Sequence, residues 1–262
     1  MIQQRSKEWF NARKKRVTGS VVGAILGHAP YMKRDDVMRS MVRDALGAER
    51  EFKGNIATQW GVDNEDKAIE DFKFLTGLHV DEAPFVPCDD WLGASPDGFI
   101  HVKDAVLEVK CPFGLRNQPS PVFKTAAEQP HYYAQMQIEM YCTGKRTCYF
   151  YQWTPYADKL EIIEYDSKWF EENMPKIQKF YFEFLSELKS PDKHLQPLKD
   201  IKQSDFADIY RDALANYETA KQLLDDVKQA LITEADEKSC VLSGLNVSKV
   251  EKKGSISYAK AL

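Results

Sequence analysis

Two short motifs place two carboxylates and a lysine close together along the chain. The first is Ser95-Pro96-Asp97-Gly98, and the second, about one strand length later, contains Glu108 and Lys110. The first predicts a turn in which Gly98 can adopt a positive φ. Residues 105–111 predict a short buried strand, on which Glu108 and Lys110 share one face. Carboxylate and carbonyl oxygens suit a hard cation such as Mg2+, beside which a lysine can hold or deprotonate water. Taken alone, such short motifs are more often an ordinary turn and strand.

A predicted helix over residues 55–75 adds a third carboxylate. Glu65 falls on the same stripe as its apolar residues, which are Ala68, Ile69, Phe72 and Leu75, so Glu65 is expected to face inward. An inward carboxylate costs on the order of 3 kcal/mol or more unless it is paired or lies near a cation. A glutamate that reaches water from the end of the stripe remains the alternative.

A second predicted helix covers residues 130–144 and begins with a proline and ends with a glycine. Tyr133, Gln137 and Tyr141 are spaced four apart on one of its faces. An amide between two aromatic rings can bond a phosphate or an attacking water molecule. Ordinary half-buried packing explains the same three residues.

In chain order, these motifs resemble the PD-(D/E)XK superfamily of metal-dependent nucleases, and more narrowly the phage lambda exonuclease (YqaJ-like) family. The residues that carry the resemblance are Glu65, Asp97, Glu108-Val109-Lys110 and residues 135–141. At the amino terminus, Trp9, Arg13 and Val17-Thr18-Gly19-Ser20 are similar to the family's opening pattern, and Trp60-Gly61 precedes Glu65 as in its Trp-Gly-x-x-x-Glu helix. The resemblance covers residues 5–166. Ala12 and Gly19 replace the usual Leu and Ala.

The resemblance implies a site with two Mg2+ ions, for which Mn2+ can substitute. Asp97 would bridge the ions, Glu108 and the Val109 carbonyl would complete the ligand shell of one, and Glu65 would reach the other. Lys110 would position or deprotonate the attacking water, with its pKa lowered by the cations. The resemblance also places Arg13, Ser20, Ser95 and Gln137 at a pocket for the terminal 5′-phosphate, and Gln137 is counted with the catalytic residues.

The charge distribution agrees with a local anion site. The 262 residues carry a net charge of −4, yet residues 1–54 contain twelve Lys and Arg against six Asp and Glu. Arg13, Lys14, Lys15 and Arg16 lie beside a predicted helix start, where free amides favour an anion. A solvated helix end is the alternative explanation. A protein that coats DNA by bulk attraction is not expected from this composition.

Composition also bounds the class of protein. No apolar run is long enough to span a bilayer and no leader precedes the first motif, so we expect a protein of the cytoplasm, without a membrane partner. The resemblance narrows this to a bacterial host cell in which a phage or mobile element encodes the protein. The five cysteines lack CxxC spacing and predict neither disulfides nor a zinc site.

The fold class expected is α/β, with a PD-(D/E)XK restriction-endonuclease-like core in which helices flank a central mixed sheet. Further helices are predicted at residues 7–14, 20–26, 34–46 and 169–188, the last interrupted near Pro175, and strands at residues 78–86, around 93, 99–102, 147–154 and 159–165. We expect residues 1–190 to form the nuclease domain, and residues 191–262 a helical arm and a β-hairpin whose strands are residues 240–250 and 255–260. In the arm, residues 204–235, apolar residues recur as a heptad stripe. The stripe would pack on the chain's own body or on another subunit.

The function expected is metal-dependent 5′-to-3′ digestion of double-stranded DNA from its ends, leaving 3′ single-stranded tails for recombination by strand annealing. The resemblance further implies a homotrimer ring around the duplex and a single-strand annealing recombinase as partner. A PD-(D/E)XK endonuclease of sequence or structure specificity is one alternative, although no base-reading element is marked. A non-catalytic DNA-binding protein is another, but it would be expected to have lost Asp97, Glu108 or Lys110.

Overall fold

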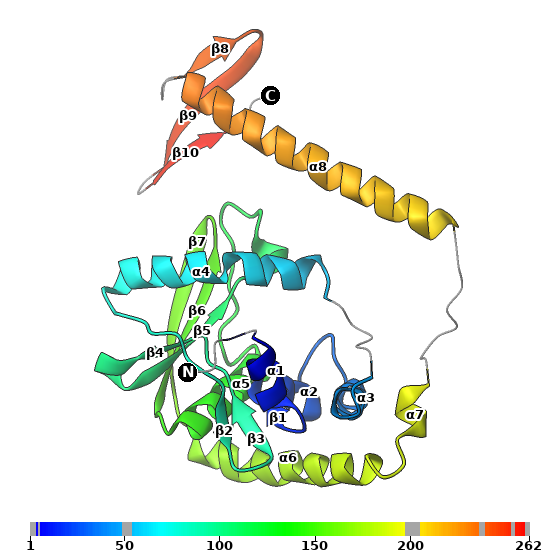
Figure 1. Ribbon diagram of the computed structural model, residues 1–262. Coiled ribbons are helices and arrows are strands. Elements are labelled where there is room, and N and C mark those ends of the chain that lie inside the picture. Colours follow the sequence, from blue (N-terminus) through cyan, green and yellow to red (C-terminus); the bar gives the residue numbers. More distant parts are fainter. Residues whose placement is uncertain are drawn as a thin grey trace. The chain divides into compact units, whose positions relative to one another are not determined.

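The computed structural model describes residues 4, 6–48, 54–196, 205–235, 239–252 and 255–259 (Figure 1). The chain divides into two compact units, Met1–Pro197 and Leu198–Leu262. The predicted assignment of a nuclease domain and an arm domain to residues 1–190 and 191–262 stays a prediction.

A mixed four-stranded sheet lies at the centre of the first unit, in the order β4-β5-β6-β7. Its strands are β4 (Gly98–Ile100), β5 (Ala105–Lys110), β6 (Thr147–Thr154) and β7 (Ala157–Glu164). Strand β5 pairs antiparallel with β4 and parallel with β6, while β6 and β7 form an antiparallel hairpin. The parallel pair is connected through helix α5 (Pro130–Thr143), as a crossover between parallel strands requires. The short 3-10 turns η1 (His101–Lys103) and η2 (Phe113–Leu115) flank β5.

Helices cover both faces of this sheet (Figure 1). On one face, Ala68 and Phe72 of α4 (Ile56–Thr76) pack in one cluster with alternate residues of β5, namely Ala105, Leu107 and Val109. On the other face, Met136 and Met140 of α5 pack with Val106. Because side chains alternate along a strand, Glu108 and Lys110 lie on the α5 face, next to each other as predicted. The predicted α/β class with a central mixed sheet is confirmed.

Most of the remaining elements of the first unit contribute to a third apolar cluster. The remaining elements are α1 (Lys7–Arg13), β1 (Val17–Thr18), α2 (Gly19–Ile25), α3 (Arg34–Ala45), β2 (Val86–Cys88), β3 (Leu92–Ala94), α6 (Ser167–Glu187) and α7 (Asp192–Leu195). Strands β1, β3 and β2 form a small sheet in that order. Val22, Val42, Ile138 and Phe180 are fully buried members of the cluster, which joins α2, α3, α5 and α6. Helix α1 is joined to the residue that follows β3 by hydrogen bonds from Trp9 and Arg13 to Ser95.

Three details of the first unit differ from the predictions. Residues 78–85 are not a strand, because they pair with the sheet only through an isolated bridge between Asp81 and Phe99. Helix α6 runs through Pro175 without interruption, since buried Ile177 and Phe180 on its following turn anchor it in the core. Leu75 is 55% exposed and does not belong to the buried stripe of α4.

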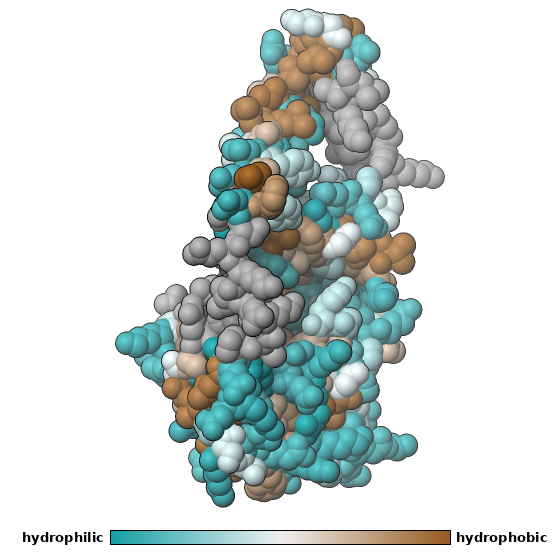
Figure 2. Space-filling view, turned by 90° about the vertical axis from the view of Figure 1, so that its right-hand side faces the viewer, coloured by the Kyte–Doolittle hydropathy of each residue, from teal (hydrophilic) through white to brown (hydrophobic). Residues whose placement is uncertain are grey.

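The second unit consists of the helix α8 (Asp205–Glu234) and the strands β8 (Cys240–Leu242), β9 (Leu245–Lys252) and β10 (Ser255–Ala259). The strands form an antiparallel sheet of three, not the predicted hairpin of two, because a turn with Ser243 and Gly244 at positive φ divides the first predicted strand. Members of the heptad stripe are exposed on α8, among them Phe206 at 82%. Apolar side chains are visible among hydrophilic ones on the surface in Figure 2. None of the helices in the described residues is long and apolar enough to cross a membrane.

Candidate functional site

The turn between β3 and β4 places Asp97 beside strand β5, which carries Glu108 and Lys110. The Asp97 N–H donates to the Leu107 carbonyl at 3.0 Å, and the Val109 N–H donates to Asp97 Oδ2 at 2.7 Å. The following residue, Gly98, does not have the expected positive φ. A glycine is required there for another reason, because a Cβ would lie 2.3 Å from Val80 Cγ1.

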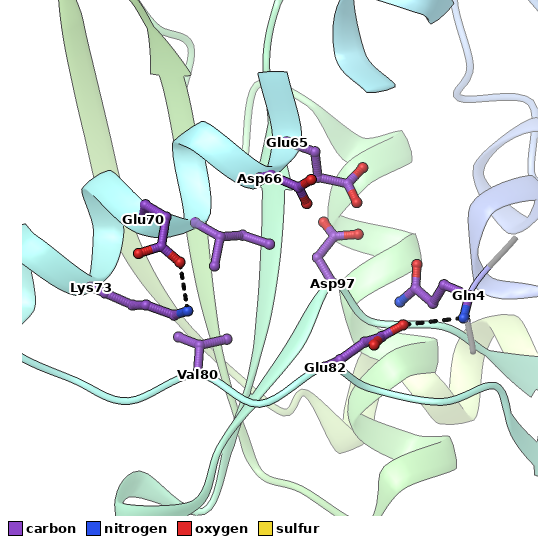
Figure 3. A pocket seen from close by; sticks show the side chains of 9 residues that line it. Gln4, Glu65, Asp66, Glu70, Lys73, Val80, Glu82 and Asp97 are labelled. Atoms are coloured by element: carbon purple, nitrogen blue, oxygen red, sulfur yellow. Dashed lines mark hydrogen bonds and ion pairs between the residues drawn. The ribbon is translucent and has the colours of Figure 1, made fainter. Parts of the chain in front are cut away.

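Asp97 and Glu65 line one cavity of about 390 Å³. Figure 3 shows their carboxylates pointing toward each other, Glu65 from α4 and Asp97 from the turn before β4. Asp66, Glu70 and Glu82 also line this cavity, and its Lys73 forms an ion pair with Glu70, so its wall is acidic on balance. An acidic wall of this kind attracts cations.

Glu108 is buried beside Lys110 on the α5 face of β5. The Lys110 ammonium forms an ion pair with Glu108 Oε1 and lies 5.0 Å from the centre of the Tyr132 ring. Glu108 Oε2 is buried without a hydrogen-bond partner. An unsatisfied buried carboxylate oxygen is costly, and a cation would satisfy it.

Two residues of α5 join this cluster and were not chosen from the sequence. Gln135 Nε2 donates to Glu108 Oε1 at 2.6 Å and to Glu139 Oε1 at 2.8 Å. Glu139 is only 1% exposed, and its Oε2 also lacks a partner. The signal was present in the sequence, because Glu139 is a carboxylate between the apolar residues Ile138 and Met140 and follows Gln135 by one helical turn.

The expectation that Gln137 lies at the phosphate pocket is wrong. Gln137 is fully buried on a different face of α5 from Gln135. Its amide donates to the Glu164 carbonyl at 2.9 Å and accepts from the Asp166 N–H at 2.8 Å. Gln137 therefore connects α5 to the end of β7, and Gln135 is the glutamine of this helix that faces the carboxylates.

Burial and mutual repulsion raise the carboxyl pKa values of the cluster. Burial, followed by the charge of Glu108, raises the pKa of Asp97 well above its usual range. Burial and the neighbouring Glu139 raise the pKa of Glu108 to about 8, and burial raises that of Glu139 to about 7. Burial opposes the charge of Lys110, but Glu108 and Asp97 outweigh it and raise the lysine pKa. The lowered pKa expected for Lys110 depended on bound cations, and without them the carboxylates dominate.

The predicted phosphate-pocket residues Arg13, Ser20 and Ser95 lie together. Arg13 donates from Nη1 to Ser95 Oγ at 3.1 Å and from Nη2 to Ser20 Oγ at 3.3 Å. The guanidinium lies 4.1 Å from the centre of the Trp9 ring, and Trp9 Nε1 also donates to Ser95 Oγ, at 3.1 Å. Ser95 precedes Asp97 by two residues. The cradle formed by Arg13, Ser20 and Ser95 is therefore adjacent in the chain to the acidic cavity.

The residues fit a divalent metal by donor chemistry. Hard oxygen donors come from Asp97, Glu65 and Glu108, and the orphaned Oε2 of Glu108 calls for a positive partner. Within the described residues, no three His, Cys, Asp or Glu side chains already converge as a metal cage. A metal that took Glu108 as a ligand would have to compete with Lys110 for this carboxylate.

Comparison with known proteins gives a consistent result. The sequence matches the family described as "YqaJ-like viral recombinase domain" over residues 8–146. An alkaline exonuclease of Laribacter hongkongensis, LHK-Exo, is similar with a TM-score of 0.58 and 26% identity over 72% of this chain and 97% of that one. The same exonuclease in complex with dAMP gives 0.59 and 27% over the same shares. A phage-related exonuclease from Haemophilus somnus 129PT shares the fold at 18% identity and a TM-score of 0.53, covering 68% of this chain and 99% of that one. These matches confirm the predicted PD-(D/E)XK-like core.

A viral protein is also related. Uncharacterized protein R354 of Acanthamoeba polyphaga mimivirus is 25% identical over 178 residues, which are 63% of this chain. The chain spans only 30% of the length of that curated relative.

Proposed function

Because the chain belongs to the YqaJ-like viral recombinase domain family, we propose that this nuclease is a metal-dependent exonuclease that digests duplex DNA from 5′ ends. The observation that carries the proposal is that a proposed phosphate-binding cradle and an acidic cavity lie next to each other. The Arg13–Ser20–Ser95 cradle and the acidic cavity with Glu65 and Asp97 are joined through a turn of three residues. Such a site offers one place for a terminal phosphate and another for the metal that acts on the next phosphodiester bond.

The carboxylates are the proposed metal ligands. Asp97, Glu108 and Glu65 would hold one or two Mg2+ or Mn2+ ions, with the Val109 carbonyl as a further oxygen donor. When bound, the metal stabilises charge on the attacking and leaving oxygens of the displacement. The Val109 N–H, bonded to Asp97 Oδ2, orients this carboxylate. Gln135 orients Glu108 in the same way.

Lys110 is the proposed partner of the attacking water. Its ammonium lies on the same face of β5 as Glu108 and is paired with it. In that position it can donate a hydrogen bond to a water molecule or stabilise negative charge on the scissile phosphate. To act as a base, Lys110 would need a bound cation that lowers its pKa, because the neighbouring carboxylates raise that pKa.

The cradle supports a preference for phosphorylated 5′ ends. A guanidinium binds a phosphate through two parallel hydrogen bonds, and a terminal phosphate carries more charge than a bridging one. Arg13 already donates through both Nη atoms to serine hydroxyls, so its fork is oriented before any phosphate arrives. We infer that the duplex end is bound here.

The proposal includes the biological setting that the family implies. The products would be 3′ single-stranded tails, and a strand-annealing recombinase of a phage or mobile element would receive them in the cytoplasm of a bacterial host. A homotrimer ring around the duplex would make digestion processive.

Digestion of linear and closed-circular duplexes of the same sequence with Mg2+ tests the proposal. We expect the linear 5′-phosphorylated duplex to be degraded to long 3′ tails and the circle to remain closed. Nicked or linearised circles would indicate an endonuclease instead. Binding without any cleavage, with either Mg2+ or Mn2+, would indicate a DNA-binding protein. Omission of metal, with a chelator present, is the control for metal dependence.

A further inference from the structure

Gln4 lies at the metal cavity although it comes from the start of the chain. It lines the cavity together with Asp97 and Glu65 (Figure 3). Its side-chain Nε2 donates to the Pro96 carbonyl at 2.8 Å and to the Ala83 carbonyl at 3.1 Å. Gln4 therefore joins the segment before β2 to the turn that carries Asp97.

The carbonyl that Gln4 binds belongs to the residue immediately before Asp97. Pro96 has no N–H with which to pair, and the turn from Ser95 to Asp97 lies between β3 and β4, outside both strands. On its far side, Asp97 is held to β5 by the hydrogen bonds with Leu107 and Val109. The Gln4 amide holds the near side of the same turn.

The position of the Asp97 carboxylate in the cavity explains why its turn needs to be held. The carboxylates of Asp97 and Glu65 face each other (Figure 3), and two like charges at close range repel each other. A metal ligand must be deprotonated, and Asp97 must then stay beside the Glu65 carboxylate for the cation to bind between them. Groups that orient metal ligands from behind keep them in place, and their loss typically lowers metal affinity or activity 10–100-fold.

We propose that Gln4 is a positioning residue of the metal site, which holds the Asp97 turn in the orientation that binds the cation. The inference rests on the proposed function, because it requires that Asp97 be a metal ligand. Gln4 itself supplies no ligand. It acts through the Pro96 carbonyl.

An amide is the group that this position needs. Both carbonyls accept from the one NH2 group of Gln4, and an amide nitrogen offers two donors. A methionine side chain of similar length offers none and carries no charge. Gln4→Met therefore removes the restraint without adding a carboxylate to the cavity, whereas Gln4→Ala removes most of the side chain.

Calorimetric titration of the full chain with Mn2+, in the absence of DNA, is the decisive experiment. For Gln4→Met and Gln4→Ala we expect Mn2+ affinity to fall at least about tenfold. In single-turnover digestion of a linear duplex, the cleavage rate at saturating DNA should fall similarly, while the DNA concentration for half-maximal rate stays within about twofold. Gln118→Ala is the matched control in the titration, because the exposed Gln118 amide also donates to a backbone carbonyl, that of Gly114 at 3.3 Å.

The outcomes separate the inference from the function it rests on. If the parent chain binds no Mn2+ and cuts no DNA, the proposed function fails and the inference fails with it. If the parent binds Mn2+ and cuts, but both Gln4 variants match it, only the positioning role is overturned. If Gln4→Ala loses stability, Gln4→Met decides, since thermal unfolding shows whether it is folded. A folded Gln4→Met chain with parental Mn2+ affinity overturns the role.

Discussion

At the scale of single residues, the site brings several carboxyl groups together. Glu108 and Glu139 share the Nε2 group of Gln135, yet the Oε2 atom of each carboxylate has no partner. The paired Lys110 neutralises one charge. Asp97 and Glu65 add two further carboxylates at the cavity. Burial, and after it the neighbouring negative charges, raises the pKa values of Asp97, Glu108 and Glu139.

Replacement of single carboxylates should separate chemistry from folding. Asp97→Asn and Glu108→Gln should each lower cleavage by a hundredfold or more, the usual scale for groups that stabilise charge in a transition state. Steady-state digestion with Mg2+ measures this, with Asp63→Asn as control, because Asp63 is an exposed carboxylate of α4. Cleavage within about tenfold of the parent rate would remove the residue from the metal site.

The raised carboxyl pKa values predict an unusual pH dependence of stability. Because the folded-state pKa values of Glu108 (about 8) and Glu139 (about 7) lie above ordinary values near 4.5, the folded chain binds more protons than the unfolded chain between these limits. The stability that they contribute is complete below about pH 4.5 and is lost as the pH rises through 7 to 8.

Thermal unfolding of the metal-free protein at pH 6 and pH 9 checks this prediction. We expect a midpoint several degrees lower at pH 9, and a larger stabilisation by Mg2+ at pH 9 than at pH 6. In Glu139→Gln, which removes one of the two carboxyl groups, the difference between the two pH values should shrink. Equal midpoints in the parent protein would contradict the predicted protonation.

Arg13 should contribute to the choice of DNA end. Arg13→Ala should reduce the preference for 5′-phosphorylated over 5′-hydroxyl duplex ends by about tenfold, since a hydrogen bond to a charged group contributes roughly 1.5–3 kcal/mol. Competition between the two kinds of end in one digestion measures the preference. Lys14→Ala removes the same charge from an exposed neighbour and should keep the preference. If the parent degraded both ends equally fast, the cradle would have no such role.

At the scale of elements, the alternation of β5 and the start and end of the longer helices were predictable because local signals determine them. Glu108 and Lys110 share a face as the strand period requires, and α5 begins at a proline and ends before a glycine. The choice between Gln135 and Gln137 was predictable only in part. The spacing of Gln135 and Glu139 by four residues is visible in the sequence, but which side of the helix faces β5 depends on tertiary packing. The positioning role of Gln4 was not predictable from the sequence, because the residues that it contacts lie about 80 and 90 positions further along the chain.

The start of β4 should be intolerant of any side chain. In Gly98→Ala the new Cβ would meet Val80 Cγ1 at 2.3 Å and the Asp81 carbonyl at 3.2 Å. We expect a loss of roughly 1–3 kcal/mol in the free energy of unfolding, the usual cost of overpacking. Denaturant unfolding measures it, and Val80→Ala in the same chain should restore part of the loss. An unchanged midpoint for Gly98→Ala would show that residues 78–81 move aside freely.

At the scale of the whole molecule, the proposed ring requires heterologous interfaces that close after three subunits. The apolar side chains exposed on α8 are candidates for such contacts, although the same helix could pack on its own subunit. Light scattering should give about 90 kDa, three times the chain mass of 30.1 kDa. A chain that ends at Pro197, where the first compact unit ends, should remain trimeric only if α8 braces its own subunit. Long-tract digestion under competitor DNA by a 30.1 kDa species would rule out the ring as the cause of processivity.

Because side chains along β5 alternate between the two faces of the sheet, this strand limits where insertions and deletions can occur in the gene. Its odd-numbered residues face α4 and its even-numbered ones face α5, so the insertion or deletion of one codon within the strand would turn Glu108 or Lys110 toward the wrong helix. Natural insertions and deletions are therefore expected to accumulate in η1 or in residues 111–129, where a shift in length leaves the faces of β5 unchanged. A library of single-codon insertions, selected for nuclease activity, would show a gap at residues 105–110 between two tolerant regions.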